Sequence, residues 1–211
     1  VRQSPGVVGA GWSMTENYIY RDVNATLTNT SDDKFRLVLD GSANDIVYDP
    51  NDGYYHTKTE SYARIRNYSD YWLVTGRDGT EYRLGYNSDS ELVSNTGKGY
   101  SLRWYLDQVE DTHGNKIYYA YQLNPFSADN GTIYLSQIRY NNDQKRAIDF
   151  VYETSDRPDG RLVYEQGNVV NQSRRLAWIN VSANGEIVRK YKLSYASLNS
   201  ENTLTSISTI T

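Results

Sequence analysis

The stretch Leu106-Asp-Gln-Val109-Glu-Asp111-Thr-His-Gly114-Asn115-Lys-Ile117-Tyr-Tyr119-Ala-Tyr121 decides the fold that the sequence predicts. Ile117, Tyr119 and Tyr121 occupy alternate positions, which is the period of a strand that buries one face. The dipeptide Gly114-Asn115 favours the positive φ angles of a tight hairpin turn. The stretch therefore predicts two antiparallel strands joined by a short turn.

The same opening, a Leu followed three positions later by Val or Ile, recurs through the second half of the chain. It begins at Leu106, Leu135, Leu176 and Leu204. After the first three openings, a return strand of alternating apolar residues ends in a tyrosine, at Tyr121, Tyr152 and Tyr195. We call each of these units a repeat. The fourth is cut off at Thr211, and we expect its unpaired edge to pair with the continuation of the same chain.

Alternating runs fill most of the remaining chain, and no segment shows the apolar spacing of an amphipathic helix. The clearest runs are Phe35–Leu39, Tyr62–Arg66, Ala147–Tyr152 and Arg189–Tyr195. Further hairpin turns are expected at Asp78-Gly79 and Asn184-Gly185. The sequence thus predicts an all-β fold of meandering antiparallel hairpins that curl into part of a shell. Irregular loops are expected near residues 40–60, 86–100 and 122–132.

Composition excludes several classes of protein. The 211 residues include 21 Tyr, 4 Trp and 3 Phe, which is not the composition of a disordered chain. A net charge of -4, spread along the chain, argues against a nucleic-acid or anionic-membrane partner. There is no Cys, and there are only two His, so thiolate zinc sites and histidine relays have almost nothing to draw on. No apolar run of about 18 residues is present to predict a membrane span.

The grammar of Leu106–Tyr121, L-x-x-V-x-D-x-x-G-N-x-I-x-Y-x-Y, resembles the tyrosine-aspartate repeat of RHS/YD proteins. Upstream motifs resemble, in order, the N-terminal domain shared by the Salmonella virulence plasmid B protein and the B subunit of insecticidal toxin complexes. These motifs are Gly9-Ala-Gly11-Trp12-Ser13-Met14, Asp33-x-Phe35-x-Leu37, Tyr55-x-Thr57-x-x-Glu60-Ser-Tyr62, Tyr71-Trp72-x-Val74-Thr75 with Asp78-Gly79-Thr80, and Arg157-Pro158-Asp159. Met14 stands where the family has Leu, which is a volume-conserving exchange.

The resemblance covers about residues 4–207 and implies a structural role. It implies an N-terminal segment over residues 1–100 and degenerate YD-type hairpin repeats over 101–211, continuous as one β-rich unit of an RHS-type shell. Such shells are secreted or lie at the cell surface and enclose a C-terminal effector. The implied partners are the rest of the parent polypeptide's shell, its enclosed cargo and other toxin-complex subunits. Because Val1 is not Met, the sequence is interpreted as a fragment of a longer protein.

No enzymatic, metal or cofactor function is predicted. The ADP-ribosylation associated with the family needs a Glu-x-Glu pair, which the chain lacks. His113 beside Asp111 is interpreted as part of a hairpin turn rather than as a general base. His56 is expected in a strand at the surface. Asp49-Pro-Asn51-Asp52-Gly53 resembles the start of a calcium loop, with Glu60 at the twelfth position, but a plain turn is the favoured interpretation.

Tyrosine offers the alternative function of a surface adhesin or carbohydrate-binding module, because exposed aromatic rings stack on sugars. Against this, the tyrosines of the repeats recur at alternate positions, where cross-strand pairs stabilise a sheet. We therefore expect most tyrosines to be structural. The three residues expected in the core of the shell are Trp12, Trp72 and Trp104.

Overall fold

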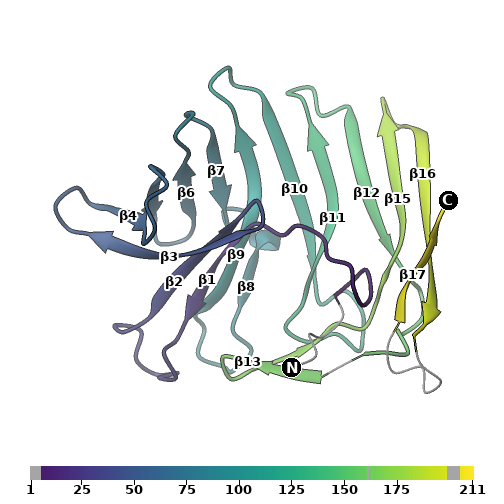
Figure 1. The fold of residues 1–211 in the computed structure, drawn as a ribbon, viewed down its shortest axis with the longest axis horizontal. Helices are drawn as coiled ribbons and strands as arrows, with labels where there is room; N and C mark the ends of the chain where they lie inside the picture. Colours follow the sequence, from purple (N-terminus) through teal and green to yellow (C-terminus); the bar gives the residue numbers. More distant parts are fainter. Residues whose placement is uncertain (1–5, 161, 199–204) are drawn as a thin grey trace. The chain divides into compact units, whose positions relative to one another are not determined.

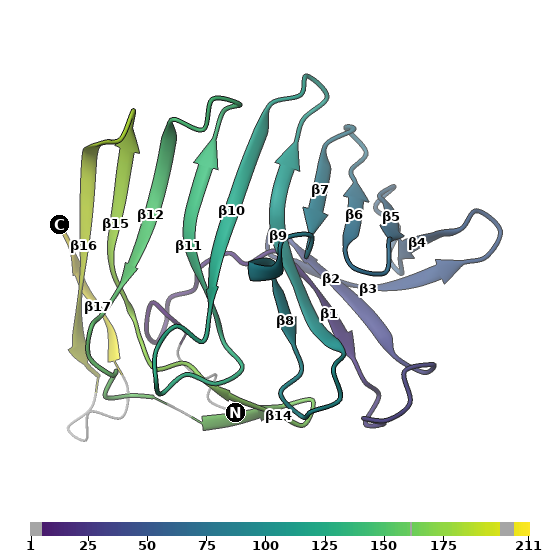
Figure 2. The same cartoon turned by 180° about the vertical axis from the view of Figure 1, so that it is seen from behind.

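The computed structural model describes residues 6–160, 162–198 and 205–211 (Figure 1, and from behind in Figure 2). In this part of the chain the regular elements are β-strands, paired antiparallel, and one 3-10 turn, Ser88–Ser90. The all-β prediction is therefore confirmed. The chain forms two compact units. The closed-sheet unit comprises Thr15–Tyr121 and Gln166–Asn168, and the open-sheet unit comprises Val1–Met14, Gln122–Glu165 and Val169–Thr211.

The sheet of the closed-sheet unit returns to its own first strand. Its eight strands, in order of pairing, are β1 (Tyr18–Asp22), β2 (Lys34–Leu39), β3 (Ser42–Asp49), β4 (Tyr54–Thr57), β5 (Arg64–Asn67), β6 (Trp72–Thr75), β7 (Glu81–Leu84) and β9 (Ser101–Glu110). β9 closes the sheet because one part of it pairs with β1 and another part with β7. Two further strands, β8 (Glu91–Val93) and β10 (Lys116–Leu123), pair along the remaining edges of β9.

The core of this unit is built from alternate residues of the paired strands. Trp72 and Trp104, 0% and 2% exposed, lie with their ring centroids 5.8 Å apart, and Phe35 packs against both. The expectation that these two tryptophans are core residues is confirmed. Gly85 has a φ of +81°, and a Cβ there would lie 2.2 Å from Cδ1 of Trp104. Only glycine lets the backbone pass this close to the indole.

The sheet of the open-sheet unit does not close. Its strands, in order of pairing, are β11 (Ile133–Tyr140), β12 (Arg146–Tyr152), β15 (Leu176–Ala183), β16 (Glu186–Ser197) and β17 (Thr205–Ile210). β13 (Leu162–Glu165) and β14 (Asn168–Asn171) form a separate two-stranded sheet. Figure 2 shows β11, β12, β15 and β16 as long neighbouring strands; turns join β11 to β12 and β15 to β16, whereas the chain between β12 and β15 passes through β13 and β14.

One end of the open sheet is covered by the N-terminal segment. The carbonyl oxygen of Val7 accepts a hydrogen bond from the amide of Leu176 at 2.8 Å, and the amide of Ala10 donates to the carbonyl of Thr205 at 2.7 Å. Val7 and Val8 pack into a core with Tyr134, Tyr152, Leu176 and Leu193. The segment that carries the glycine and tryptophan motif therefore contributes to the core mainly through residues before Gly9.

The expectation that Trp12 belongs to the core is wrong, because its side chain is 54% exposed. Trp12 follows Gly11 in an irregular segment outside any strand, so no sheet face buries its indole. The apolar residue of this motif that does pack against the core is Met14. A motif with two closely spaced glycines fixes a backbone path more reliably than it fixes the burial of the side chain that follows.

The strands and turns predicted from alternation are largely confirmed. β10, β12 and β16 contain the expected return strands of the three repeats. Asn184 and Gly185 both have positive φ angles, as the predicted hairpin turn requires. The run Tyr62–Arg66 is only partly correct. β5 begins at Arg64, and Tyr62 has a φ of +59°.

The irregular loop expected over residues 40–60 is wrong, since β3 and β4 form a hairpin there. Figure 1 shows this hairpin extending past the neighbouring strands. In β3 only Ile46 is buried, so the strand shows little apolar alternation. The region 86–100 contains β8, whereas residues 124–132 are irregular except for a single bridge residue, as expected.

The boundaries of the two compact units do not coincide with the boundary between the segments 1–100 and 101–211 that the resemblance implies. β9 and most of β10, which form the first repeat, lie within the closed-sheet unit because β9 is the strand that closes its sheet. The opening of the fourth repeat, Leu204, lies outside the described residues. Among the described residues, no helix has the length and apolar character needed to cross a membrane.

Candidate functional site

The three predicted repeats form hairpins, and one hydrogen bond recurs in all of them. The hydroxyl of the last tyrosine donates to the backbone carbonyl of the opening leucine. The three bonds are Tyr121 to Leu106 at 2.7 Å, Tyr152 to Leu135 at 2.8 Å and Tyr195 to Leu176 at 2.6 Å. Each bond joins the end of a repeat to its own beginning, so we call it the repeat clasp.

The register of each hairpin explains the sequence pattern of the repeats. The Val or Ile three positions after the opening Leu lies opposite an apolar residue of the return strand. These cross-strand pairs are Val109 with Ile117, Ile138 with Ile148, and Ile179 with Tyr191. The pattern therefore specifies one cross-strand pair, and the clasp adds a second link between the same two strands.

Burial of the clasp tyrosines changes their acid-base behaviour. Loss of water contact raises the pKa of Tyr121 well above its ordinary value, and it raises the pKa of Tyr195 to about 12. Both phenols therefore keep their protons at neutral pH and can donate to the carbonyl. The first repeat has one more link, because the amide of Tyr121 donates to the carboxylate of Asp89 at 2.9 Å.

A buried ion pair fixes the irregular segment between β12 and β13. Nε of Arg157 donates to Oδ1 of Asp159 at 2.7 Å, and both side chains are almost fully buried. The other oxygen of Asp159 accepts from the amide of Thr205 at 2.8 Å and from its hydroxyl at 2.6 Å. Nη1 of Arg157 donates to the carbonyl of Gly6 at 3.0 Å. The pair thus connects the N-terminal segment with the start of β17.

The motif Arg157-Pro158-Asp159 was recognised in the sequence, but the sequence did not indicate that Arg157 and Asp159 form a buried ion pair. Burial alone raises the pKa of Asp159, yet the hydrogen bonds from Arg157 and Thr205 outweigh it and hold the pKa below its ordinary value. The carboxylate is therefore charged in the fold and depends on these donors. Removing either member of the Arg157–Asp159 pair takes away the counter-charge that it provides to the other, buried member.

One face of the open sheet carries apolar side chains that the core does not fully cover. Ile138, Ile148 and Val181 are cross-strand neighbours on β11, β12 and β15, and each is half-buried. Because side chains alternate between faces, they share the face of Phe150 and Ile179, which pack against the core. This row, which we call the apolar row, extends the core face beyond the part that the N-terminal segment covers.

His113 lies in a hairpin turn, as expected. Oδ1 of Asp111 accepts hydrogen bonds from the amides of His113 and Asn115 at 2.8 and 2.9 Å, and Oδ2 accepts from the side chain of Asn115 at 2.7 Å. These bonds, first of all that from the Asn115 side chain, lower the pKa of Asp111. The carboxylate is used by the turn itself, because its hydrogen bonds come from the two backbone amides and from the side chain of Asn115.

The turn after β3 brings together the carboxylates of Asp49 and Asp52 and the imidazole of His56. One potential ligand atom from each of these residues lies within 4.8 Å of the others. Among the described residues, this is the group of carboxylate and imidazole side chains that is close enough together to hold a metal ion. Oδ1 of Asp49 accepts two bonds from Asn51, and Oδ2 of Asp52 lies 2.8 Å from Nε2 of His56. The contacts are those of a turn, with the carboxylates exposed or half-exposed.

The contact between Asp52 and His56 is not among the features that the sequence predicts. The two residues are four positions apart, and a hairpin turn places them side by side. Glu60 does not join the group. Its Oε1 accepts a hydrogen bond from the amide of Tyr62 at 2.5 Å.

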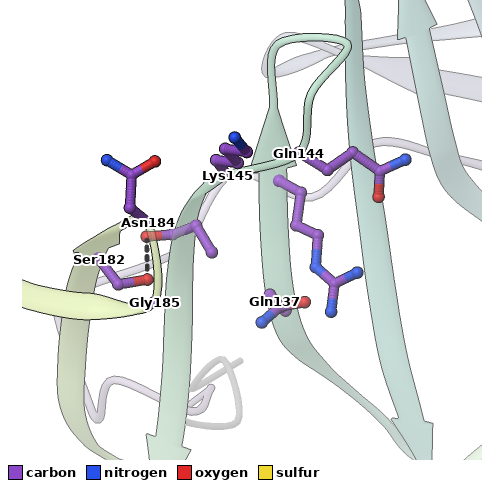
Figure 3. Close-up of a pocket in the computed structure, with 8 residues that line it drawn as sticks. Gln137, Gln144, Lys145, Ser182, Asn184 and Gly185 are labelled. Atoms are coloured by element: carbon purple, nitrogen blue, oxygen red, sulfur yellow. Dashed lines mark hydrogen bonds between the residues drawn. The ribbon is translucent and has the colours of Figure 1, made fainter.

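Figure 3 shows a shallow hollow of about 450 Å³ at the turns of the open sheet. Its lining is polar and includes Gln137, Arg139, Lys145 and Asn184. The hydroxyl of Ser182 donates to the carbonyl of Ala147 at 3.5 Å, drawn as a dashed line, and the amide of Asn184 donates to Lys145. Among the described residues, those that line the hollow include no carboxylate.

Comparison with known proteins gives a family and a set of related folds. The family described as Salmonella virulence plasmid 65kDa B protein matches residues 44–184. The N-terminal domain of effector protein SpvB from Salmonella typhimurium strain LT2 superposes with a TM-score of 0.78 at 17% identity, covering 99% of this chain and 89% of that domain. The comparison with curated proteins gives no match.

Two toxin-complex structures share the same fold. The TcdB2-TccC3 structure superposes with a TM-score of 0.75 at 15% identity, covering 98% of this chain and 14% of that one. The Photorhabdus luminescens Tc holotoxin pore gives a TM-score of 0.72 at 14% identity, covering 97% of this chain and 13% of that one. The chain therefore corresponds to a small part of these toxin-complex chains and to nearly the whole SpvB domain. None of these comparisons assigns the RHS/YD repeat, which stays a prediction.

Proposed function

Because the chain belongs to the family of the Salmonella virulence plasmid 65kDa B protein, we propose that it is a structural segment of a toxin-complex-like shell that encloses a cargo or effector polypeptide. The shell fold is shared with the SpvB domain and with the toxin-complex structures. The enclosure of a cargo is the proposed part. Its mechanism is steric, with backbone pairing between neighbouring strands of the wall.

The repeat clasp is the observation that carries this proposal. A wall made from a single sheet leaves much of its apolar surface half-exposed, so burial alone stabilises each hairpin less than in a two-layered core. A hydrogen bond from a buried phenol to a backbone carbonyl holds the two strands of one repeat together without a second layer. The clasp occurs in three successive repeats with the same two partners, as a modular wall requires.

The apolar row supports the proposal that the open sheet contacts an unfolded or extended polypeptide. Ile138, Ile148 and Val181 present half-buried aliphatic side chains on the core face of the open sheet. Contiguous apolar surface of this kind favours binding of another apolar surface over exposure to water. We propose that this face lies on the inside of the shell.

The edge of β17 supports pairing with a further strand of the shell. β17 pairs with β16 on one edge, and on its other edge the described pairing is a bridge from Gly9 to Ser206. Both backbone groups of Thr211 bond to Lys192, so in the alternating antiparallel pattern the amide of Ile210 faces the other edge. That edge can accept another strand by ordinary sheet pairing.

The proposed role is not catalytic, and the proposed location is outside the producing cell or at its surface. The described surroundings of both histidines support the first statement, because His113 is part of a turn and His56 pairs with Asp52 at the surface. The proposed partners are the rest of the parent polypeptide's shell, its cargo and other toxin-complex subunits. The likeness to toxin-complex structures supports the last of these.

Hydrogen exchange tests the pairing part of the proposal. The amide of Ile210 is expected to exchange more slowly in the assembled parent polypeptide than in the isolated chain, since a neighbouring strand would bond it there. The amide of Thr211, which already bonds to Lys192, serves as the control. Equal exchange of Ile210 in both forms would contradict the proposal.

A further inference from the structure

The shallow hollow in Figure 3 opens on one face of the open sheet. Arg139, Ala147 and Ser182 line it, and they are cross-strand neighbours in one row across β11, β12 and β15. Their side chains therefore project from the same face of the sheet. The apolar row occupies the adjacent position in each of these strands, so it projects from the opposite face. A ligand in the hollow and a polypeptide on the apolar row would not compete.

The hollow is formed by a small residue between two turns. Ala147 is buried and has only a methyl side chain, so the cross-strand row is low at its centre. Lys145 lies in the turn between β11 and β12, and Asn184 lies in the turn between β15 and β16. The amide of Asn184 donates to the carbonyl oxygen of Lys145 at 2.7 Å, which links the two turns. The backbone at the rim is thus held in place before a ligand arrives, and this lowers the entropic cost of binding.

The side chains that line the hollow carry an excess of positive charge. Arg139 and Lys145 are both in the lining, whereas the described lining residues include no carboxylate. In the part of the chain that the structure describes, neither of these cations forms an ion pair. Asp143, in the same turn as Lys145, pairs instead with Arg146 at 3.5 Å. The two cations of the hollow are therefore available to an anion from solution.

The next cross-strand row on this face does not cancel that charge. It contains Asp149, whose Oδ1 accepts a hydrogen bond from the side chain of Gln137 at 2.5 Å. The same row contains Lys190 on β16, so it holds one charge of each sign. The electrostatic character of the hollow is therefore set by Arg139 and Lys145.

The two cations flank Ala147 from different directions. Arg139 is its cross-strand partner on β11, and Lys145 precedes it by two positions, the spacing that returns a side chain to the same face. A group seated over the methyl of Ala147 would lie between a guanidinium and an ammonium. The guanidinium offers a planar pair of donors that matches two oxygens of one anion, and the ammonium acts as a compact point charge.

We propose that this hollow binds the phosphate group of a small phosphate monoester. Such a group carries about −1.5 to −2 charges near neutral pH and has three acceptor oxygens, which matches two cations with several donors. A carboxylate has one negative charge and two oxygens and would match the pair less well. The volume of about 450 Å³ is within the range of roughly 300–1,000 Å³ that is usual for small-molecule sites.

NMR titration of the protein with glycerol 3-phosphate and with glucose 6-phosphate tests the proposal. The amide resonances of Lys145, Ala147, Asn184 and Gly185 report on the hollow. Glycerol and glucose are the probes without the phosphate group, and acetate is the carboxylate probe. A salt concentration of about 0.1 M screens charges that are more than about 10 Å away, so the titration reports local contacts.

Two pairs of matched variants separate a local site from general electrostatics. Arg139→Gln is compared with Arg189→Gln, because Arg189 is exposed and pairs with a residue of the apolar row, on the other face. Lys145→Gln is compared with Lys190→Gln, because Nζ of Lys190 lies over the ring of Trp178, 5.9 Å from its centroid. Neither control residue lines the hollow. Circular dichroism and the melting temperature establish that each variant is folded.

At least one of the two monoesters is expected to bind saturably, with a Kd on the order of 1 mM or lower. Arg139→Gln is expected to weaken that binding by about tenfold and Lys145→Gln by about threefold, whereas each control should change it by less than about twofold. Three results would overturn the proposal: no saturable binding of either monoester, equally tight binding of acetate or of the parent alcohols, or equal losses in the hollow variants and their controls. Each result can be read without knowing whether the protein encloses a cargo.

Discussion

The hydroxyl of Tyr121 donates to the carbonyl oxygen of Leu106 at 2.7 Å and so ties the last residue of one repeat to its first. The same contact recurs between Tyr152 and Leu135 and between Tyr195 and Leu176, although the connecting segments differ in length. The tyrosine at the end of the repeat is therefore defined by a contact as well as by a spacing. Its ring packs in the sheet while its hydroxyl satisfies a backbone group.

Tyr121→Phe is expected to destabilise the fold by about 1–3 kcal/mol, because it leaves the clasp carbonyl of Leu106 without its donor in a buried place. The measurement is the free energy of unfolding in urea at neutral pH. The matched control is Tyr164→Phe, since Tyr164 is 72% exposed and has no clasp. An unchanged stability for Tyr121→Phe would mean that the clasp carries no energy.

Stability is expected to fall at high pH because of the clasp tyrosines. The pKa of Tyr195 is raised from about 10 in the unfolded chain to about 12 in the fold, so the folded state holds the proton more tightly. The stabilisation is complete below pH 10 and is lost as the pH rises toward 12. Urea unfolding between pH 8 and 12 measures this slope. Tyr195→Phe should flatten it, and an equally steep slope in that variant would contradict the assignment.

The three Trp→Ala variants are expected to differ strongly in their stability. Trp72→Ala and Trp104→Ala are each expected to cost about 3–5 kcal/mol, because both remove a fully buried ring from the closed-sheet core. Trp12→Ala is expected to change stability by less than about 0.5 kcal/mol, because its side chain is largely exposed. Thermal or chemical unfolding of the three variants tests this. A large loss of stability in Trp12→Ala would contradict the assignment of Trp12 to the surface.

Asp159→Asn is expected to destabilise the open-sheet unit by about 3–5 kcal/mol, since it removes the buried carboxylate that pairs with the guanidinium of Arg157 at 2.7 Å. The control is Asp143→Asn, because Asp143 pairs with Arg146 at the surface and such pairs contribute about 0–1 kcal/mol. Unfolding curves followed by near-ultraviolet circular dichroism report both changes. Similar small losses in the two variants would show that the buried pair does not hold the segment in place.

Local sequence was sufficient to predict a strand where one of its faces is regularly apolar, and to predict a turn where the turn residues favour positive φ angles. The return strand Ile117–Tyr121 and the turn Asn184-Gly185 are such cases, and both are confirmed. β3 escaped prediction because only Ile46 is buried in it, so its alternation is hidden. Trp12 was wrongly placed because an aromatic residue in a motif does not report which side of the backbone the fold covers.

Long-range features were outside the reach of periodicity. The closure of the sheet depends on pairing between β1 and β9, for example Ile19 with Trp104, and no local pattern states which distant strands meet. The same holds for Asp159 and Thr205. The contact of Asp52 with His56 could have been found from the hairpin turn between them.

Protease protection of the cargo tests the central claim most directly. The intact parent polypeptide and a variant that combines Tyr121→Phe, Tyr152→Phe and Tyr195→Phe are treated with the same protease, and cleavage within the segment downstream of the shell is followed over time. The shell account predicts that this segment is cleaved much more slowly in the wild type than when it is expressed alone, and that the triple variant loses part of this protection. Cleavage at the same rate in the intact polypeptide and in the isolated segment would contradict enclosure.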